Sequence, residues 1–274
     1  MPADPVQSVS VHSIHGETAR PGTDALAVEE PLAILVSHGP LADRRRTPIS
    51  ITMRTPGHDA DLAAGLLFAE GVIQSADRIL NIEPSAMENA VRVELHPEVP
   101  LDLRHLDRRG FTTSSCGVCG KTTLDAIEAK CDGPRSGGSI RPAIVHSLPE
   151  RLRESQPAFS RTGGLHAAAL FDFSGTLLGV REDVGRHNAV DKLIGAEFRA
   201  GRVPLNDRVL LVSGRASFEL LQKAAMAGVP VFAAIGAPSS LAVSLANRMG
   251  ITLLGFVRDG RFNIYTGAER IEKN

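Results

Sequence analysis

Tryptophan is absent from the 274 residues of this sequence, and tyrosine occurs once, as Tyr265. Aromatic platforms on which nucleic-acid bases could stack are therefore scarce, and a formal net charge of −1 provides no excess of basic side chains for phosphate backbones. No apolar run approaches the roughly 18 residues that indicate a membrane-spanning helix. The N-terminus also lacks a charged-then-apolar signal pattern. These absences argue against nucleic-acid binding and membrane insertion, and they predict a cytoplasmic protein.

Cysteine is scarce too, yet two of the three cysteines are separated by only two residues. Cys116 and Cys119 lie in the run Thr-Thr-Ser-Ser-Cys-Gly-Val-Cys-Gly-Lys-Thr-Thr at residues 112–123. The apolar spacing behind this run predicts a helix over residues 123–130, which places both thiols at or just before its N-terminus. Backbone N–H groups and the helix dipole favour a thiolate there, and Lys121 adds positive charge. The motif therefore predicts a reactive pair of sulfur atoms.

Other uses of paired cysteines fit this sequence less well. A structural zinc needs four ligands, and neither a second Cys-x-x-Cys nor a His-x-x-x-His follows, so we expect no structural zinc. A phosphate loop ending at residues 120–122 would need glycine at Ser115, and a thioredoxin-like pair would have an aromatic neighbour. A structural disulfide is disfavoured in a reducing compartment. Cys131 stands alone beyond the predicted helix, and we expect it to be a small apolar filler.

The first part of the chain predicts a tail followed by a small domain. Residues 1–24 are polar and aperiodic, which predicts a loose tail with at most one late strand. Residues 25–110 mix short strands with one helix and predict a small α+β domain. The expected strands are residues 25–30, 32–36, 49–54 and 91–95, and the expected helix is residues 59–70.

Residues 111–274 predict a larger α/β domain that carries the cysteine motif. After a hairpin and a helix, apolar strands and helices alternate strictly, which is typical of a parallel sheet layered between helices. The expected helices are residues 148–155, a segment ending at Gly201, and residues 218–227 and 240–249; the expected strands are residues 167–173, 176–180, 209–212, 231–235, 251–257 and 262–265.

Ligands of such sheets collect outside the carboxyl ends of the strands. Three loops leave those ends, at residues 213–217, 236–239 and 258–261. The first loop combines small residues, Arg215 and a helix N-terminus, which suits a phosphate group. The same spacing is equally compatible with a tight strand-to-helix turn capped by Ser217. Spacing alone leaves both interpretations open.

His166 could complete a three-ligand zinc site with Cys116 and Cys119, as in nucleoside deaminases. Those enzymes place the histidine before the cysteines and a glutamate two residues after it, whereas here the histidine follows and Ala168 occupies that position. Deaminase chemistry therefore lacks its base. The sequence is compatible with a deaminase-like scaffold without zinc.

The segment that opens the helix after the hairpin, residues 181–192, is dense in charge, which a buried helix tolerates only if the charges are paired or used. In one interpretation the role is structural: Asp183 caps the helix, and Asp191 pairs with Lys192 or Arg186. In the other, Arg186 and His187 face a pocket and contact a cofactor or a partner protein. The sequence does not separate the two.

Several stretches of the chain together resemble the FdhD/NarQ family of formate dehydrogenase accessory sulfurtransferases. One is the Ser-Ser-Cys-Gly-Val-Cys-Gly-Lys run at residues 114–121. The others lie at residues 29–32, 54–57, 61–65, 70–71, 162–166, 181–192, 213–219 and 255–258. The resemblance covers about residues 28–271, with one departure at residues 37–39, where the family commonly has an Asn-Gly turn.

The resemblance implies a specific activity. Such proteins accept sulfur from a cysteine desulfurase as a cysteine persulfide and pass it to the molybdenum bis(molybdopterin guanine dinucleotide) cofactor before that cofactor enters formate dehydrogenase. It also implies a cytidine-deaminase-like fold and a homodimer. A non-enzymatic chaperone of the molybdenum cofactor is the alternative, because it too would need a pocket and thiols. A thiol–disulfide oxidoreductase is a third hypothesis.

Within that resemblance we expect Cys116 to carry the persulfide and Cys119 to support it or to resolve it as a disulfide. We expect the guanine nucleotide ends, which GDP would mimic, to bind at the carboxyl edge of the sheet. Arginine offers a planar fork of donors to phosphate, and a carboxylate accepts from guanine. The expected contact residues are Phe256, Val257, Arg258, Asp259, Gly260, Arg261, Ser213, Gly214, Arg215, Ser217 and His187. An ordinary Asp-Gly hairpin with solvated arginines is the plain alternative for the first six.

Overall fold

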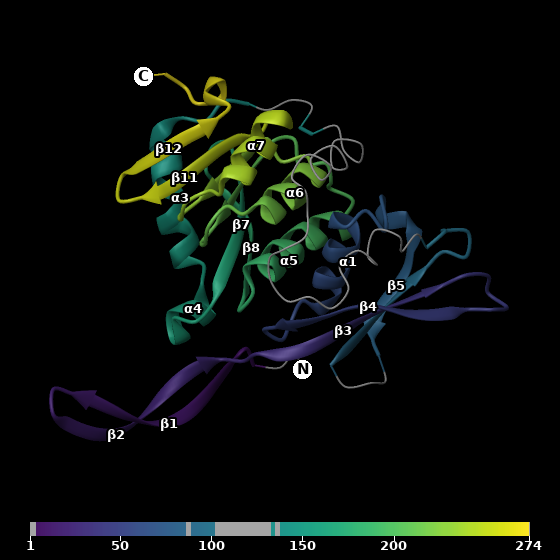
Figure 1. Ribbon diagram of the computed structural model, residues 1–274, viewed down its shortest axis with the longest axis horizontal. Helices are drawn as coiled ribbons and strands as arrows, with labels where there is room; N and C mark the ends of the chain where they lie inside the picture. The colour runs from purple at the N-terminus through teal and green to yellow at the C-terminus, as the bar shows by residue number, and fades with distance from the viewer. Residues whose placement is uncertain (1–3, 86–88, 102–132, 135–137, 274) are drawn as a thin grey trace.

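The structure is a computed structural model that describes residues 4–85, 89–101, 133–134 and 138–273. The cysteine motif, Cys131, the predicted helix at residues 123–130 and the predicted domain boundary near residue 110 lie outside the described residues. Figure 1 shows the arrangement of the helices and strands of the described residues.

A six-stranded mixed sheet forms the centre of the larger part. Its order is β12-β11-β10-β9-β7-β8. The central three strands are parallel to one another, as predicted, and each flank adds antiparallel strands, so the sheet is mixed. The strands are β7 (His166–Asp172), β8 (Leu177–Asp183), β9 (Arg208–Val212), β10 (Val231–Ala234), β11 (Thr252–Arg258) and β12 (Arg261–Thr266).

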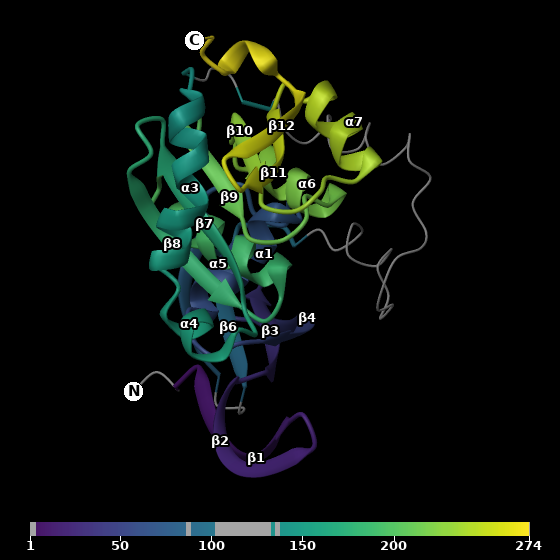
Figure 2. The same ribbon diagram turned by 90° about the vertical axis from the view of Figure 1, so that its left-hand side faces the viewer.

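Helices cover both faces of this sheet, which gives the layered arrangement expected from the alternating pattern (Figure 2). Side chains alternate along β9: Leu210 and Val212 belong to one apolar cluster, Val209 and Leu211 to the other. The first cluster includes α5 (Arg186–Arg199), α6 (Phe218–Met226) and α7 (Ser240–Arg248), and the second includes α3 (Pro142–Glu154). No helix in the described part of the chain is long and apolar enough to cross a membrane.

A second, four-stranded sheet lies in the N-terminal part, with the order β4-β3-β6-β5. Its strands are β3 (Glu30–His38), β4 (Arg45–Arg54), β5 (Ile79–Pro84) and β6 (Ala90–Leu95). The predicted helix is confirmed as α1 (Asp59–Ala69), followed by a short 3-10 turn, η1 (Ala76–Arg78). Strand β5 was not predicted. The buried side chains of this part continue into the cluster under α5–α7, so the two parts share one core.

The junction of the two parts is a close crossing of α1 and α5. A Cβ placed on Gly65 would lie 1.9 Å from the carbonyl oxygen of Asp191, and one on Gly195 would lie 1.9 Å from that of Asp61. Only glycine permits this approach of two backbones. The crossing fixes the N-terminal sheet against the larger sheet.

The prediction of a loose tail over residues 1–24 is wrong. The chain there forms a hairpin of β1 (Val6–His15) and β2 (Thr18–Ala27), ten residues each in continuous register, which projects from the body (Figure 1). Most of its side chains are exposed, so the sequence shows little of the alternation that indicates a half-buried strand. Only its base packs, where Val6 and Ala27 meet Leu165.

Two helical boundaries also differ from the predictions. Helix α3 begins at Pro142 rather than at residue 148, because proline is well suited to the first turn of a helix. Pro149 lies inside α3 and obscured its pattern. A short helix, α4 (Pro157–Thr162), follows and was not predicted, and a 3-10 turn, η3 (Ala268–Arg270), comes after β12.

Candidate functional site

The loops at the carboxyl ends of β9 and β10 are joined by backbone hydrogen bonds. Gly236 N–H donates to the carbonyl of Gly214 at 2.9 Å, and Ala216 N–H donates to that of Ala237 at 3.1 Å. Phe256, near the end of β11, donates to the carbonyl of Gly236 at 3.0 Å. A Cβ on Gly236 would lie 2.9 Å from the Gly214 oxygen, so glycine is needed there. The structure thus brings the predicted loops 213–217 and 236–239 together at one edge.

His166 and Arg186 lie against the first of these loops. A Cβ on Gly214 would be 3.5 Å from Nδ1 of His166 and 3.9 Å from Cδ of Arg186. Burial lowers the pKa of His166, and its electrostatic interactions with Arg186 and His187 lower it further, while Asp183 opposes them. The lowered pKa favours the neutral imidazole. Among the described residues no group of three His, Cys, Asp or Glu side chains is arranged to hold a metal ion.

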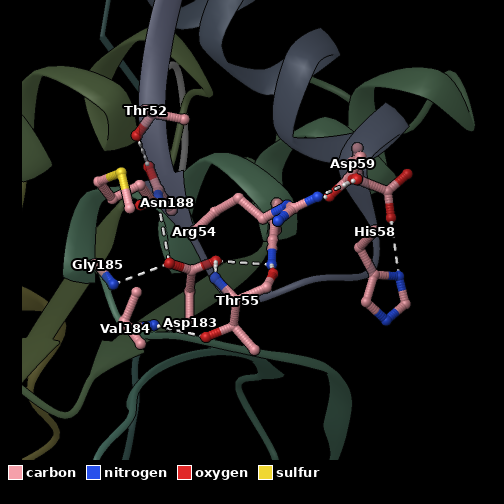
Figure 3. Close-up of polar contacts among 12 residues, drawn as sticks. Thr52, Arg54, Thr55, His58, Asp59, Asp183, Val184, Gly185 and Asn188 are labelled. Atoms are coloured by element: carbon pink, nitrogen blue, oxygen red, sulfur yellow. Dashed lines mark hydrogen bonds and ion pairs between the residues drawn. The ribbon is translucent and has the colours of Figure 1, made fainter. Parts of the chain in front are cut away.

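Asp183 is a structural anchor (Figure 3). Its buried carboxylate lies 2.7 Å from Nζ of Lys192 and accepts N–H groups of Thr55 at 3.2 Å and Gly185 at 2.8 Å. Lys192 also donates to the carbonyl of Thr55 at 2.8 Å. The N-cap of α5 is Gly185, without a side-chain cap, so the capping by Asp183 in the structural interpretation is not what the structure shows. Instead, Asp183 ties α5 to the end of β4.

Asp191 pairs with neither Lys192 nor Arg186, the partners that the structural interpretation of segment 181–192 offered. It accepts two bonds from Nζ of Lys223 in α6, at 2.7 and 2.9 Å. Burial raises the pKa of Asp191, and the lysine opposes that change. Because α5 and α6 lie side by side, the partner comes from a different helix, which sequence spacing does not reveal.

His187 faces α6. Its Nε2 lies 2.7 Å from Oε2 of Glu219, beside a polar cavity of about 220 Å³ that Lys223 and Asp191 also line. Arg186, the preceding residue in the chain, lies instead beside Gly214. The structure therefore separates the two side chains that the second interpretation of segment 181–192 placed together.

The segment at residues 256–261 forms the end of the β11–β12 hairpin. Arg258 and Arg261 are cross-strand partners, and Asp259 and Gly260 between them have φ angles of 54° and 68°. Arg258, Asp259, Gly260 and Arg261 are exposed, whereas the Val257 side chain is fully buried in the core. The Arg258 guanidinium lies 5.7 Å from the ring centre of Phe256. The two arginines thus stand side by side on open surface, and Val257 can offer a ligand only its backbone.

Two larger cavities were not predicted. One, of about 460 Å³, opens beside Ser213 and His166 and is closed on another side by Gln156. The other, of about 510 Å³, lies between α1 and the N-terminal sheet, beside Arg54 and Asp61. Helix α4, which lines the first cavity, is too short for its apolar residues to show a helical period in the sequence. The second cavity is lined in part by the Arg-Thr-Pro-Gly stretch at residues 54–57. That stretch is the one sequence feature that could have indicated the cavity.

Asp61 is the charged centre of the second cavity. Burial alone would raise its pKa, but hydrogen bonds from His58, Arg199 and Arg181 lower it to about 2. The Arg181 contact is 3.1 Å and the His58 contact 3.5 Å. His58 has a left-handed backbone, with φ 58°, immediately before α1, where its imidazole reaches Asp61. The carboxylate therefore stays ionised and fully paired.

A mixed sheet between helix layers, with two hydrogen-bonded loops at the carboxyl edge of its parallel strands, defines a layered α/β protein. The FdhD/NarQ family model matches residues 27–272. The chain therefore belongs to the FdhD/NarQ family.

Individual relatives agree with that assignment. A protein of Streptomyces avermitilis named sulfur carrier protein FdhD is 51% identical over 261 residues, which cover 90% of this chain and 89% of its own. A protein of the same name from Mycobacterium tuberculosis is 49% identical, with 90% and 92% covered. A crystal structure from Desulfotalea psychrophila, described as a formate dehydrogenase accessory protein, is similar with a TM-score of 0.76 and 26% identity, covering 97% of this chain and 99% of that one.

Proposed function

We propose that this protein is a sulfur carrier that accepts persulfide sulfur from a cysteine desulfurase. It then passes the sulfur to the molybdenum bis(molybdopterin guanine dinucleotide) cofactor, which formate dehydrogenase needs for activity. The observation that carries the proposal is the 51% identity, over nine-tenths of the chain, to a protein named as a sulfur carrier. The Cys-x-x-Cys motif supplies the reactive thiols that a sulfur carrier needs.

The loading step is a thiol exchange. The Cys116 thiolate attacks the outer sulfur of the donor persulfide; the donor S–S bond breaks, and its cysteine leaves as a thiolate. A new S–S bond forms on Cys116, so the step needs no oxidant or reductant. Cys119 supports this persulfide, or attacks its inner sulfur to leave a disulfide and release the outer sulfur as sulfide.

The acceptor is held, in this proposal, at the carboxyl edge of the larger sheet. The loop at residues 213–217 precedes α6, whose N-terminal N–H groups suit a phosphate. Arg258 and Arg261 offer paired guanidinium groups on open surface, with Asp259 between them as an acceptor for guanine. His187 is the further contact proposed, reached from the first turn of α5.

We further propose that the protein acts as a homodimer in the cytoplasm, a reducing compartment in which free thiols persist. Its protein partners are the desulfurase and formate dehydrogenase.

Replacement of Cys116 tests the proposal. Cys116→Ala should abolish the maturation of formate dehydrogenase activity in cells that lack the native gene, because the thiolate that accepts the sulfur is gone. Cys131→Ser is the matched control and should mature the enzyme normally. If Cys116→Ala is active and Cys119→Ala is not, the roles of the two thiols are reversed.

A further inference from the structure

The N-terminal hairpin is a two-stranded ribbon with little of the body behind it. Strands β1 and β2 pair over ten residues each without a register shift, and Figure 1 shows the ribbon projecting from the body. Only its base is covered, where Val6 and Ala27 pack against Leu165. An isolated two-stranded hairpin is marginally stable in water, whereas a sheet of three or more strands is stable. A further strand would therefore stabilise the projecting part.

The outer edge of β1 has free hydrogen-bonding groups. At the base of the hairpin, the N–H of Val28 donates to the carbonyl of Pro5 at 2.9 Å. Because bonded pairs alternate along an antiparallel ladder, the odd-numbered residues of β1 bond to β2, and the even-numbered residues point their N–H and C=O groups away from it. Pro21, which has no N–H, lies opposite an even-numbered residue, His12, as this alternation requires.

Strand β1 has none of the features that protect an exposed strand edge. Its sequence, Val-Gln-Ser-Val-Ser-Val-His-Ser-Ile-His, contains no proline, glycine, lysine, arginine or carboxylate, and Ile14 is 65% exposed. The outer strands of the two larger sheets differ, because β4, β5, β8 and β12 each contain a proline or an arginine. A long, uncharged strand edge is a template for pairing with another chain.

Strand β2 protects the opposite edge of the ribbon. It contains Arg20, Pro21, Gly22 and Asp24 within five residues. Proline cannot donate a ladder hydrogen bond, and charged side chains disfavour the approach of another strand. The ribbon therefore has one open edge. Pairing through one open edge closes with two copies, whereas two open edges would extend the assembly into a fibre.

We propose that the open edge of β1 pairs with β1 of a second copy of this chain. The two antiparallel strands form a four-stranded sheet in the order β2-β1-β1-β2 across a two-fold axis. The register that fits the sequence sets Ser10 opposite Ser10 of the second copy, as a bonded pair on the axis. It then places Val9 opposite Val11 of the second copy, and Val11 opposite Val9, at the positions where side chains lie closest.

This proposal rests on the homodimer of the proposed function and gives that homodimer its interface. Neither β1 strand carries a formal charge at neutral histidine, so no like charges meet across the axis. The even-numbered groups of one copy meet the even-numbered groups of the other, so every outward N–H between Ser8 and His12 finds a carbonyl. The body of each copy lies at the base of its own ribbon, outside the paired segment.

Proline substitution on the two edges of the ribbon tests the pairing, with the mass in solution measured by light scattering on the full chain. Ser10→Pro removes an outward N–H from β1 and leaves the bonds to β2 in place. It should raise the dissociation constant of the dimer about tenfold or more, because two bonds on the axis are lost. Thr23→Pro is the matched control: Thr23 lies opposite Ser10 in the hairpin, on the outer edge of β2, and this variant should remain a dimer.

Cross-linking tests the register. In a background in which Cys116, Cys119 and Cys131 are serine, Ser10→Cys should form a disulfide between two copies when diamide is added as the oxidant. Paired Cα atoms on the axis lie about 5.5 Å apart, within the range of about 4.4–6.8 Å that a disulfide spans. Thr23→Cys is three strand spacings from its counterpart, roughly 14 Å, and should stay unlinked.

The outcomes separate the interface from the proposed function. A monomeric wild-type protein would overturn both the pairing and the homodimer, and would leave the edge of β1 to a strand of another protein. A dimer that Ser10→Pro does not weaken, and that Ser10→Cys does not cross-link, would overturn the pairing alone. A wild-type dimer that cross-links through Ser10→Cys but accepts no sulfur from a desulfurase would support the pairing and contradict only the sulfur-carrier function.

Discussion

The junction of α1 and α5 and the carboxyl edge of the larger sheet are both rich in polar side chains, but they use them differently. At the junction, Asp183 lies against Lys192, Asp191 against Lys223, and Asp61 against Arg181 and Arg199. At the edge, Gln156 has a buried donor without an acceptor among the described residues. The contrast teaches that paired carboxylates hold the two parts of the architecture together, whereas the amide of Gln156 at the edge is left unpaired within the described part of the chain.

The largest expected effect is at the junction. Asp183→Ala leaves the buried ammonium of Lys192 without its counter-ion, and removal of one partner of a buried pair costs about 3–5 kcal/mol. Urea denaturation should show this loss in the free energy of unfolding. A double variant, Asp183→Leu/Lys192→Met, removes both charges and should recover much of it. A loss below about 1 kcal/mol in Asp183→Ala would mean that the pair does not hold the junction.

At the edge, the expected effect is on binding rather than on stability. Arg258→Ala should weaken GDP binding by about 1.5–3 kcal/mol, because a charged hydrogen bond is lost from an exposed position. GDP should also bind better than ADP, since Asp259 accepts from guanine. Arg141→Ala, at the start of α3, serves as the control. Normal GDP binding by Arg258→Ala/Arg261→Ala would place the nucleotide away from the hairpin.

A smaller, pH-dependent effect comes from Asp61. Its pKa is about 2 in the folded protein, below the ordinary 3.8, so it stabilises the fold above pH 3.8 and this stability is lost as the pH falls through 2. A shift of nearly two units corresponds to about 2 kcal/mol. The difference in unfolding free energy between wild type and Asp61→Asn should therefore narrow by about that amount from pH 5 to pH 2. A constant difference would show that the carboxylate is not ion-paired in solution.

The sequence predicted those parts of the fold in which apolar residues recur at the regular spacing of a strand or a helix. Strands β9, β10 and β11 and the helices between them are apolar runs and amphipathic segments whose spacing determines their structure. The N-terminal hairpin escaped prediction because most of its side chains face solvent and show no burial pattern. Helix α4 escaped because six residues are less than two turns.

The candidate site was predicted less completely, for a related reason. Loops 213–217 and 236–239 were placed at one edge because strand direction alone brings them together, and their backbone bonds confirm it. The partners of Asp183 and Asp191 were wrong or missed because Thr55 and Lys223 come from other elements. Gln156 lies in a connection between two helices, where no period indicates burial. Long-range packing, rather than local pattern, decides these contacts.

The central claim, that Cys116 carries sulfur, is tested most directly by mass spectrometry of the protein after incubation with a cysteine desulfurase and cysteine. The account predicts an adduct of about 32 Da, one sulfur atom, on the peptide that contains Cys116, retained in Cys119→Ala, absent from Cys116→Ala and removed by a reductant. The absence of any adduct on both the wild-type protein and Cys119→Ala would contradict sulfur transfer and favour a cofactor chaperone.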